Sequence, residues 1–222
     1  TGGEGFHLWQ TAGNAVSGNV SLKAAARAMA VSNVNASMGR IVASPTAGSC
    51  GIIPGVLISA AEKLGKTDDE IVDALFTAGA VGKVIALNAT LAGAEGGCQA
   101  ECGSAVAMAA AAVVELSGGT PRQVGDAVAI ALKSMMGLVC DPVAGLVEVP
   151  CIKRNGMGAV QAMLACDMVM AGIESVIPPD EVIKAMDEVG RMMPEQLRET
   201  AQGGLAATPT GKQIQQRLFG EK

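Results

Sequence analysis

The sequence has 222 residues, of which half are hydrophobic, 2% are aromatic and 17% are charged, with a net charge of -5. This length supports one domain with a large core, which must be built from Ala, Val, Leu, Ile and Met. The acidic balance and the lack of a basic run argue against nucleic-acid binding, which needs clustered Lys and Arg.

Helices are predicted along most of the chain, after a Gly-rich opening stretch, residues 1–18, that predicts irregular structure. A capping box formed by Thr67 and Glu70 starts one of these helices, and Gly65 ends the helix before it. The predicted helices cover residues 24–38, 52–64, 68 to about 91, 100–116, 121 to about 136 and 157–173, with shorter ones after Pro178-Pro179, after Pro194 and after Gly211.

No sustained alternation of apolar and polar residues marks a strand, and Ala, Met and Leu favour helix. The predicted fold class is therefore all-α, a bundle-like multi-helix domain over residues 1–222. Thr1 stands where a translated chain would begin with Met, which is compatible with N-terminal truncation. Glycine and proline breaks between the helices coincide with cysteines and hydroxyl residues, and a helical protein places its sites on such connections.

Neither of the apolar segments is predicted to cross a membrane. The longest uninterrupted apolar run is Ala105–Val114, well short of the roughly 20 residues that a span needs. Lys83 and Asn88 interrupt a second apolar segment, residues 74–94. Both segments are expected to be buried helices of a cytoplasmic protein.

The six cysteines fall in a chain without secretory features, which favours a reducing compartment where thiols are ligands or core residues. Without paired Cys-x-x-Cys knuckles, a zinc ribbon is not expected. Cys98, Cys140 and Cys151 stand beside Gly, Asp-Pro and Pro, respectively. Such breaks suit thiolate ligands of an iron–sulfur cluster, because the backbone can approach the cluster, although the same residues also fit core thiols.

At these segments the sequence resembles the iron–sulfur-dependent L-serine dehydratases, specifically their α chain or catalytic domain. The runs that carry the resemblance are ASMGRIVASPTAGSCGIIPG (36–55), GAEGGCQAECGSAVAM (93–108) and CDPVAGLVEVPCIKRNGMGAVQ (140–161), and the similarity covers roughly residues 20 to 200. The resemblance implies conversion of L-serine to pyruvate and ammonia with a [4Fe–4S] cluster. It also implies three cysteine ligands, which match Cys98, Cys140 and Cys151. Three protein ligands leave one iron open to act as a Lewis acid.

The loop before Cys50 is rich in hydroxyl groups and glycine. Ser44, Thr46, Gly48 and Ser49 form a candidate anion nest for the serine carboxylate. The alternative is a capped turn leading into the helix at residue 52, because Ser and Thr commonly cap helices. The resemblance favours substrate binding.

The remaining cysteines are expected to pack rather than ligate. Cys166 lies in an apolar helix, Ala162–Ala171, and is expected in the core. Cys102 stands four residues after Cys98 and is expected near the site, with a fourth-ligand role as the alternative. Cys50 is expected close to the site.

A general base must remove the α-proton of serine, and the sequence does not identify it. Lys83, Lys153 and Glu95 are candidates together with Glu101, none with a decisive signal, and a base from a partner chain is an equal alternative. The only histidine, His7, is expected to be functionally idle.

The family also implies partners, because its members join this domain to a smaller regulatory β domain or subunit that nothing in this chain matches. An oligomer is expected. The C-terminal cysteine of some members is missing from the ending LFGEK.

Three rival interpretations remain. An iron–sulfur cysteine desulfidase would use the same anchoring on a β-thiol, and a helical scaffold subunit would have no activity. A pyridoxal-phosphate dehydratase would need a strand-rich fold with a phosphate-binding glycine loop, which this sequence does not suggest.

Overall fold

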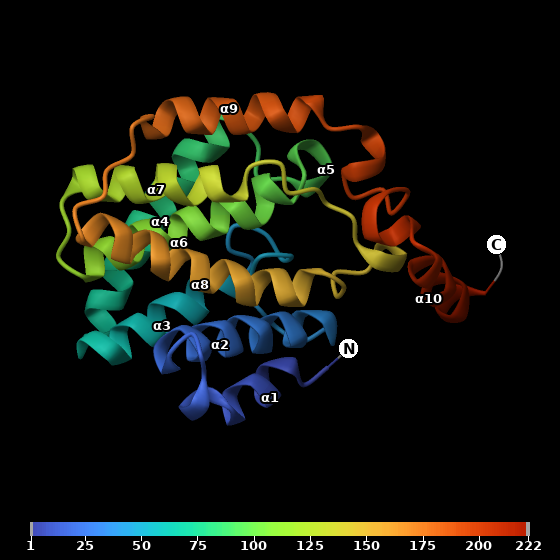
Figure 1. Cartoon of the computed structure of the whole chain (residues 1–222), viewed down its shortest axis with the longest axis horizontal. Coiled ribbons are helices and arrows are strands. Elements are labelled where there is room, and N and C mark those ends of the chain that lie inside the picture. Colours follow the sequence, from blue (N-terminus) through green and yellow to red (C-terminus); the bar gives the residue numbers. More distant parts are fainter. Residues whose placement is uncertain (1, 221–222) are drawn as a thin grey trace.

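Ten α-helices lie within residues 2–220, the part of the chain that this computed structural model describes (Figure 1). They are α1 (Glu4–Gln10), α2 (Asn19–Ala36), α3 (Ile52–Leu64), α4 (Asp68–Asn88), α5 (Gly93–Gly96), α6 (Ser104–Leu116), α7 (Pro121–Met135), α8 (Cys151–Met170), α9 (Pro179–Met192) and α10 (Pro209–Phe219). The described residues contain no strand, and only an isolated bridge joins Cys140 and Arg198. The predicted all-α class is confirmed.

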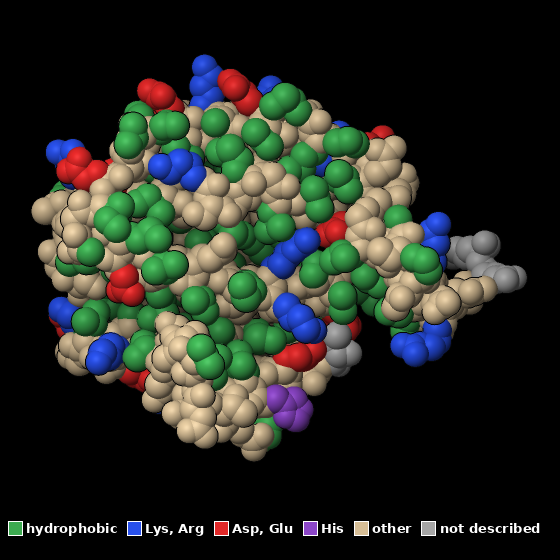
Figure 2. Space-filling view, viewed as in Figure 1, with side chains coloured by type: hydrophobic (Ala, Val, Ile, Leu, Met, Phe, Trp, Pro, Cys, Tyr) green, Lys and Arg blue, Asp and Glu red, His purple; other side chains and the backbone are tan. Residues whose placement is uncertain are grey.

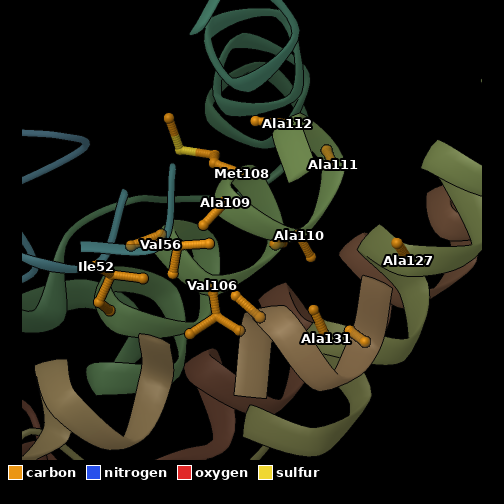
Figure 3. Close-up of a cluster of buried hydrophobic side chains, with 14 of the residues drawn as sticks. Ile52, Val56, Val106, Met108, Ala109, Ala110, Ala111, Ala112, Ala127 and Ala131 are labelled. Carbon is orange, nitrogen blue, oxygen red and sulfur yellow. The ribbon is translucent and has the colours of Figure 1, made fainter. Parts of the chain in front are cut away.

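Helix α6 is the centre of the fold. Every residue of α6 except Glu115 is buried, and the helix contacts α3, α4, α7 and α8. Figure 3 shows Ala109–Ala112 of α6 between side chains of α3 and α7. Because alanine side chains are short, neighbouring helices can approach α6 from several sides. A short π-helical turn, η2 (Gln99–Gly103), leads directly into it.

Glycine allows α2 and α3 to pack closely. A Cβ atom at Gly55 of α3 would lie 2.7 Å from the Ala24 carbonyl oxygen and 2.8 Å from the Ala28 nitrogen of α2. Any side chain at this position would therefore push the two helices apart. This packing places the loop before α3 against the start of α8, since α2 contacts both helices.

Capping residues and glycines in the sequence predicted several helix ends correctly. Thr67 and Glu70 form a capping box at the start of α4, and Thr120 and Gln123 form another at α7. Gly65 follows α3 in the left-handed conformation, with φ of 67°.

Several boundaries differ from the prediction: α2 begins at Asn19 rather than residue 24, α4 ends at Asn88, α6 begins at Ser104 and α10 begins at Pro209. The helix predicted after Pro194 is only a 3-10 turn, Glu195–Leu197. The two largest differences lie at the N-terminus and at α8. Residues 4–10 form helix α1, where irregular structure was expected. The reason is a long-range contact, because Asn33 of α2 bonds the Glu4 carboxylate and Trp9 stacks beneath Lys23 and Arg27. Such contacts leave no local signal.

Helix α8 begins at Cys151, whereas the prediction placed its start at residue 157. Pro150, interpreted as a breaker, is the N-cap residue. Gly156, predicted as the end of a loop, lies inside the helix, where Met29 packs against it. Ile52 and Val106 pack against Gly158 in the next turn. The early start makes Cys151 the first residue of a long buried helix.

The segment Gln99–Leu116 is long and apolar enough to cross a membrane by length and composition, but 89% of it is buried inside the protein. A core helix passes the same test. On the face shown in Figure 2, Lys and Arg side chains are scattered rather than gathered into a continuous basic surface.

Replacing Gly55 by Ala should lower the free energy of unfolding by roughly 1–3 kcal/mol, because the added methyl group overpacks the α2 and α3 contact. The matched control is Gly79→Ala, at an exposed position of α4 where a Cβ atom meets nothing within 4 Å. That change should raise stability by about 0.5–1 kcal/mol through helix propensity. Urea unfolding followed by circular dichroism measures both. Equal effects of the two changes would contradict the packing account.

Candidate metal centre

Three buried cysteines stand at breaks close to the starts of α6 and α8, which lie at the same end of the molecule (Figure 1). Cys98 immediately precedes η2, Cys140 lies in the extended stretch after α7, and Cys151 opens α8. Gly97 makes the first of these turns with φ of +75°, and a Cβ atom there would lie 2.9 Å from the Leu138 carbonyl oxygen. Only glycine permits that close approach.

The electrostatics place the three thiols in one neighbourhood. Burial, followed by the charge of Cys98, raises the pKa of Cys140 far above its ordinary range. Burial, followed again by Cys98, raises the pKa of Cys151 to about 12. Such thiols stay protonated unless a cation compensates the thiolate charge, and a metal centre supplies one.

Cys98 has a second thiol next to it. Candidate ligand atoms of Cys98, Glu101 and Cys102 all lie within 4.8 Å of one another. A hydrogen bond from Cys102 lowers the pKa of Cys98, and the same bond raises the pKa of Cys102. These opposite directions favour Cys98 as the acceptor and Cys102 as the donor of the pair.

The other two cysteines differ in their distance from the site: burial and, to a smaller extent, the charge of Glu101 raise the pKa of Cys50, whereas Glu101 is not among the groups that act on Cys166. Cys166 lies in α8, with its sulfur 3.9 Å from the Ser117 hydroxyl. Cys50 is buried at the end of the hydroxyl-rich loop and lines an apolar cavity of about 620 Å³ between α2, α3 and α4. Neither pairs with another cysteine.

The hydroxyl-rich loop holds a carboxylate that belongs to the chain itself. Thr46 Oγ1 donates to Glu101 Oε1 at 2.5 Å, and the backbone N–H of Gly48 bonds the same carboxyl group. A hydroxyl has one proton, so Ser49, whose oxygen lies 2.9 Å from Thr46 Oγ1, must donate to Thr46. The direction of this short relay is therefore fixed, from Ser49 through Thr46 to Glu101.

Glu101 connects the loop to the thiols. The ideal Cβ position of Gly93 lies 3.1 Å from Cys140 Sγ and 3.4 Å from Glu101 Oε2. Oε1 thus faces the loop while Oε2 lies towards Cys140. Burial is the main cause that raises the pKa of Glu101, and the nearby carboxylate of Glu199 adds to it.

A buried amide fixes the loop to α8. Asn155 is fully buried and its Nδ2 donates to the carbonyl oxygens of Gly48 (2.7 Å) and Cys151 (3.0 Å). Its Oδ1 accepts the Gly51 N–H at 3.0 Å. One side chain therefore sets the position of the loop relative to Cys151.

Of the four base candidates, only Glu101 lies among the thiols. Lys83 is exposed on α4, and Glu95 is exposed and accepts a hydrogen bond from Thr90. Lys153 follows Cys151 but is exposed, and its charge acts on Glu4. Ser44 is half-buried beside the cavity that Cys50 lines.

Sequence reasoning missed Glu199. Its Oε2 lies 3.4 Å from the same Gly93 position, and its backbone N–H donates to the Cys140 carbonyl oxygen at 2.8 Å. The residue has φ of 65°, which is uncommon outside glycine and is found at strained functional positions. No motif surrounds it, so nothing in the sequence pointed to it.

Replacing Asn155 by Ala should lower the free energy of unfolding by roughly 2–4 kcal/mol, because three buried backbone groups lose their partner. The control Asn88→Ala removes an exposed amide that bonds only Val84 of its own helix, and it should stay within about 0.5 kcal/mol of the parent. Chemical unfolding measures the difference. A cost at Asn155 no larger than at Asn88 would show that the amide does not fix the loop.

The sequence of the chain matches a known family. The family described as serine dehydratase alpha chain matches residues 2–206. The probable L-serine dehydratase alpha chain of Bacillus subtilis is 58% identical over 99% of this chain and 74% of the relative. The L-serine dehydratase alpha chain of Peptoniphilus asaccharolyticus is 50% identical over 96% of this chain and 73% of the relative.

A longer relative also aligns. The L-serine dehydratase TdcG of Escherichia coli is 47% identical over 81% of this chain, which spans 40% of that protein. Coverage of nearly the whole chain at these identities establishes the relationship. The chain belongs to the serine dehydratase α-chain family.

Proposed function

We propose that this chain is the catalytic α chain of an L-serine dehydratase that converts L-serine to pyruvate and ammonia with a [4Fe–4S] cluster. The observation that carries the proposal is the convergence of three buried cysteines with a carboxylate that a hydroxyl-rich loop holds in place. The relatives named L-serine dehydratase support the substrate. Residues 1–222 are assigned to one catalytic domain.

The donor set fits an iron–sulfur cluster. Cys98, Cys140 and Cys151 are buried, come from three different segments and influence one another electrically. Thiolates on glycine and proline breaks are the usual ligands of such clusters. We assign these three cysteines as the ligands and Cys102 as the hydrogen-bond donor to Cys98.

A cluster held by Cys98, Cys140 and Cys151 would have one iron without a protein ligand, and it would supply the Lewis acidity that makes the β-hydroxyl group a viable leaving group. The chain itself positions the substrate. The loop carrying Ser44, Thr46, Gly48 and Ser49 binds the serine carboxylate in this proposal. Support comes from the carboxylate that the loop already holds, that of Glu101. Thr46 has one hydroxyl proton and gives it to Glu101 before the substrate binds, so in this proposal the substrate carboxylate displaces Glu101 from Thr46.

Glu101 is assigned as the acceptor of the α-proton. Before the substrate binds, Thr46 holds its Oε1, while Oε2 lies towards Cys140. Loss of the α-proton and the β-hydroxyl leaves an enamine, which tautomerises to an imine, and hydrolysis of the imine gives pyruvate and ammonia. A buried carboxylate with a raised pKa is a stronger base than an exposed one.

The name alpha chain, printed for the relatives, supports a separate β partner for this chain. We propose that the working enzyme is an oligomer of the two in the cytoplasm.

Substitutions in the loop should lower turnover without loss of the cluster, whereas substitutions of the cysteine ligands should remove the cluster as well. Thr46→Ala or Ser49→Ala should keep the visible absorbance of the cluster and lower turnover by roughly ten- to a hundredfold, the cost of a lost hydrogen bond to a charged group. Cys140→Ser should lose both the visible absorbance of the cluster and the turnover of serine. Anaerobic reconstitution of the complete enzyme, followed by pyruvate release from serine, measures these outcomes.

Parallel assays with threonine and cysteine define the leaving group. Faster release of sulfide from cysteine than of pyruvate from serine would make the chain a desulfidase. Loop variants that turn over serine at the parent rate would reduce the loop to a helix cap.

Glu101→Gln should keep the cluster and lower kcat by roughly a hundred- to ten-thousandfold, because general-base catalysis is lost. In the parent, turnover should fall as pH drops through the pKa of Glu101, since only the ionised form accepts a proton. This limb should lie above the ordinary glutamate range, because burial raises that pKa. Glu188→Gln, at an exposed position of α9, is the matched control and should leave the pH profile unchanged. A Glu101→Gln variant with the parent profile would exclude this assignment.

A further inference from the structure

A buried carboxylate beside Cys140 accepts hydrogen bonds from two distant segments. Asp141 is only 3% exposed. Its Oδ1 accepts from Arg154 Nη2 at 2.9 Å, and its Oδ2 accepts from the backbone N–H of Leu205 at 2.7 Å. Both carboxylate oxygens are therefore in use, one for each segment.

The first of these bonds ties together two of the three cysteine segments. Arg154 lies in the first turn of α8, which Cys151 opens. Its Nη1 also donates to the carbonyl oxygen of Val139 at 2.9 Å. The guanidinium group thus donates to Val139 and Asp141, the residues on both sides of Cys140. These two bonds hold the Cys140 turn against the start of α8, which carries Cys151.

The second bond fastens the C-terminal segment, residues 195–207, over Cys140. The Cys140 N–H donates to Leu197 O at 2.9 Å, and the Cys140 carbonyl accepts from Glu199 N at 2.8 Å. Further along, Gly204 has φ of +56°, and a Cβ atom there would lie 2.7 Å from the Cβ of Asp141. The backbone can reach the carboxylate only because Gly204 has no side chain.

The chemistry of Asp141 makes it difficult to replace. Arg154 and Leu205 both present donors, and a carboxylate offers an acceptor to each. An asparagine amide has one acceptor oxygen and one donor nitrogen. Whichever way it turns, one of the two bonds becomes a contact between two donors, at a site where water is excluded.

We propose that Asp141 is a positioning residue that locks the C-terminal segment and the start of α8 onto the Cys140 turn, and that retention of the metal depends on this lock. The inference rests on the proposed function, in which Cys140 and Cys151 are ligands. Asp141 does not touch the metal in this account, but acts through the two cysteines. The C-terminal segment, which also carries Glu199, is thereby part of the metal centre.

The test is Asp141→Asn in the complete enzyme, reconstituted anaerobically with iron and sulfide. Iron release to a chelator, followed by the decay of visible absorbance well below the melting temperature, should be about ten- to a hundredfold faster than in the parent, the usual effect of losing a partner of a metal ligand. In the metal-free protein, limited proteolysis should cut residues 195–207 sooner. Release that stays at the parent rate would overturn the proposal.

Two further variants distinguish loss of the Asp141 contacts from a general folding defect. Gly204→Ala keeps both Asp141 and Arg154 but adds a methyl group that pushes the C-terminal segment off the carboxylate, and it should also speed iron release. Thr208→Ala removes the cap of α10 without touching Asp141, and it should release iron at the parent rate. Equal effects of Gly204→Ala and Thr208→Ala would mean general loosening and would overturn the lock.

The two proposals fail in different ways. A parent enzyme that takes up no iron overturns the proposed function, and the role of Asp141 towards the metal falls with it. A parent that holds iron, with Asp141→Asn and Gly204→Ala both holding it equally well, overturns the lock alone.

Discussion

The short side chains of α6 set the distances on which the site depends. Because this helix is buried on nearly all sides, α3, α4, α7 and α8 pack against it at once. The helices that carry or precede the cysteine segments therefore share one neighbour. A larger residue in the middle of α6 would move several of them together, so the position of the metal centre and the stability of the core are not independent.

The site concentrates negative charge in a place with little water. Cys98, Cys140, Cys151 and Glu101 lie close enough to raise one another's cost of ionisation, and Glu199 adds to it. Buried anions of this kind need a compensating cation or donors. The chain supplies donors through Thr46, Gly48 and Cys102, and the positive charge of Arg154 acts on Cys98 and Cys151. In the proposed function, a metal bound by the thiols would supply the rest of the compensation.

The sequence predicted what local chemistry determines. Capping boxes, glycine stops and helix-favouring alanines identified most helices, and the cysteines at glycine and proline breaks identified the segments that meet at the site. Glu199 was not predicted as a site residue, because it is placed there by a backbone contact with Cys140, 59 residues earlier in the chain. No local pattern encodes that contact. The early start of α8 was not predicted either, because a proline such as Pro150 can interrupt a helix or stand at its N-cap, and the sequence does not distinguish the two.

The candidates for the general base also could not be distinguished from local sequence alone. Lys83, Lys153, Glu95 and Glu101 were equivalent as residue types. The fold separated them, since three are exposed and only Glu101 is held between the loop and the thiols. A glutamate three residues after a cysteine has no signal of its own. Its place in the π-helical turn η2, at the start of the central helix, could not be predicted from the residue alone.

The carboxylate that Thr46 and Gly48 hold has a consequence for selectivity. It is covalently tethered beside its donors, so its effective concentration there is high. A free carboxylic acid entering the loop must compete with it, and a carboxylate alone gains little by doing so. A molecule that carries a second anchoring group can offset the competition. If the loop binds the substrate as proposed, it would discriminate against simple acids and in favour of substrates that bind at two points.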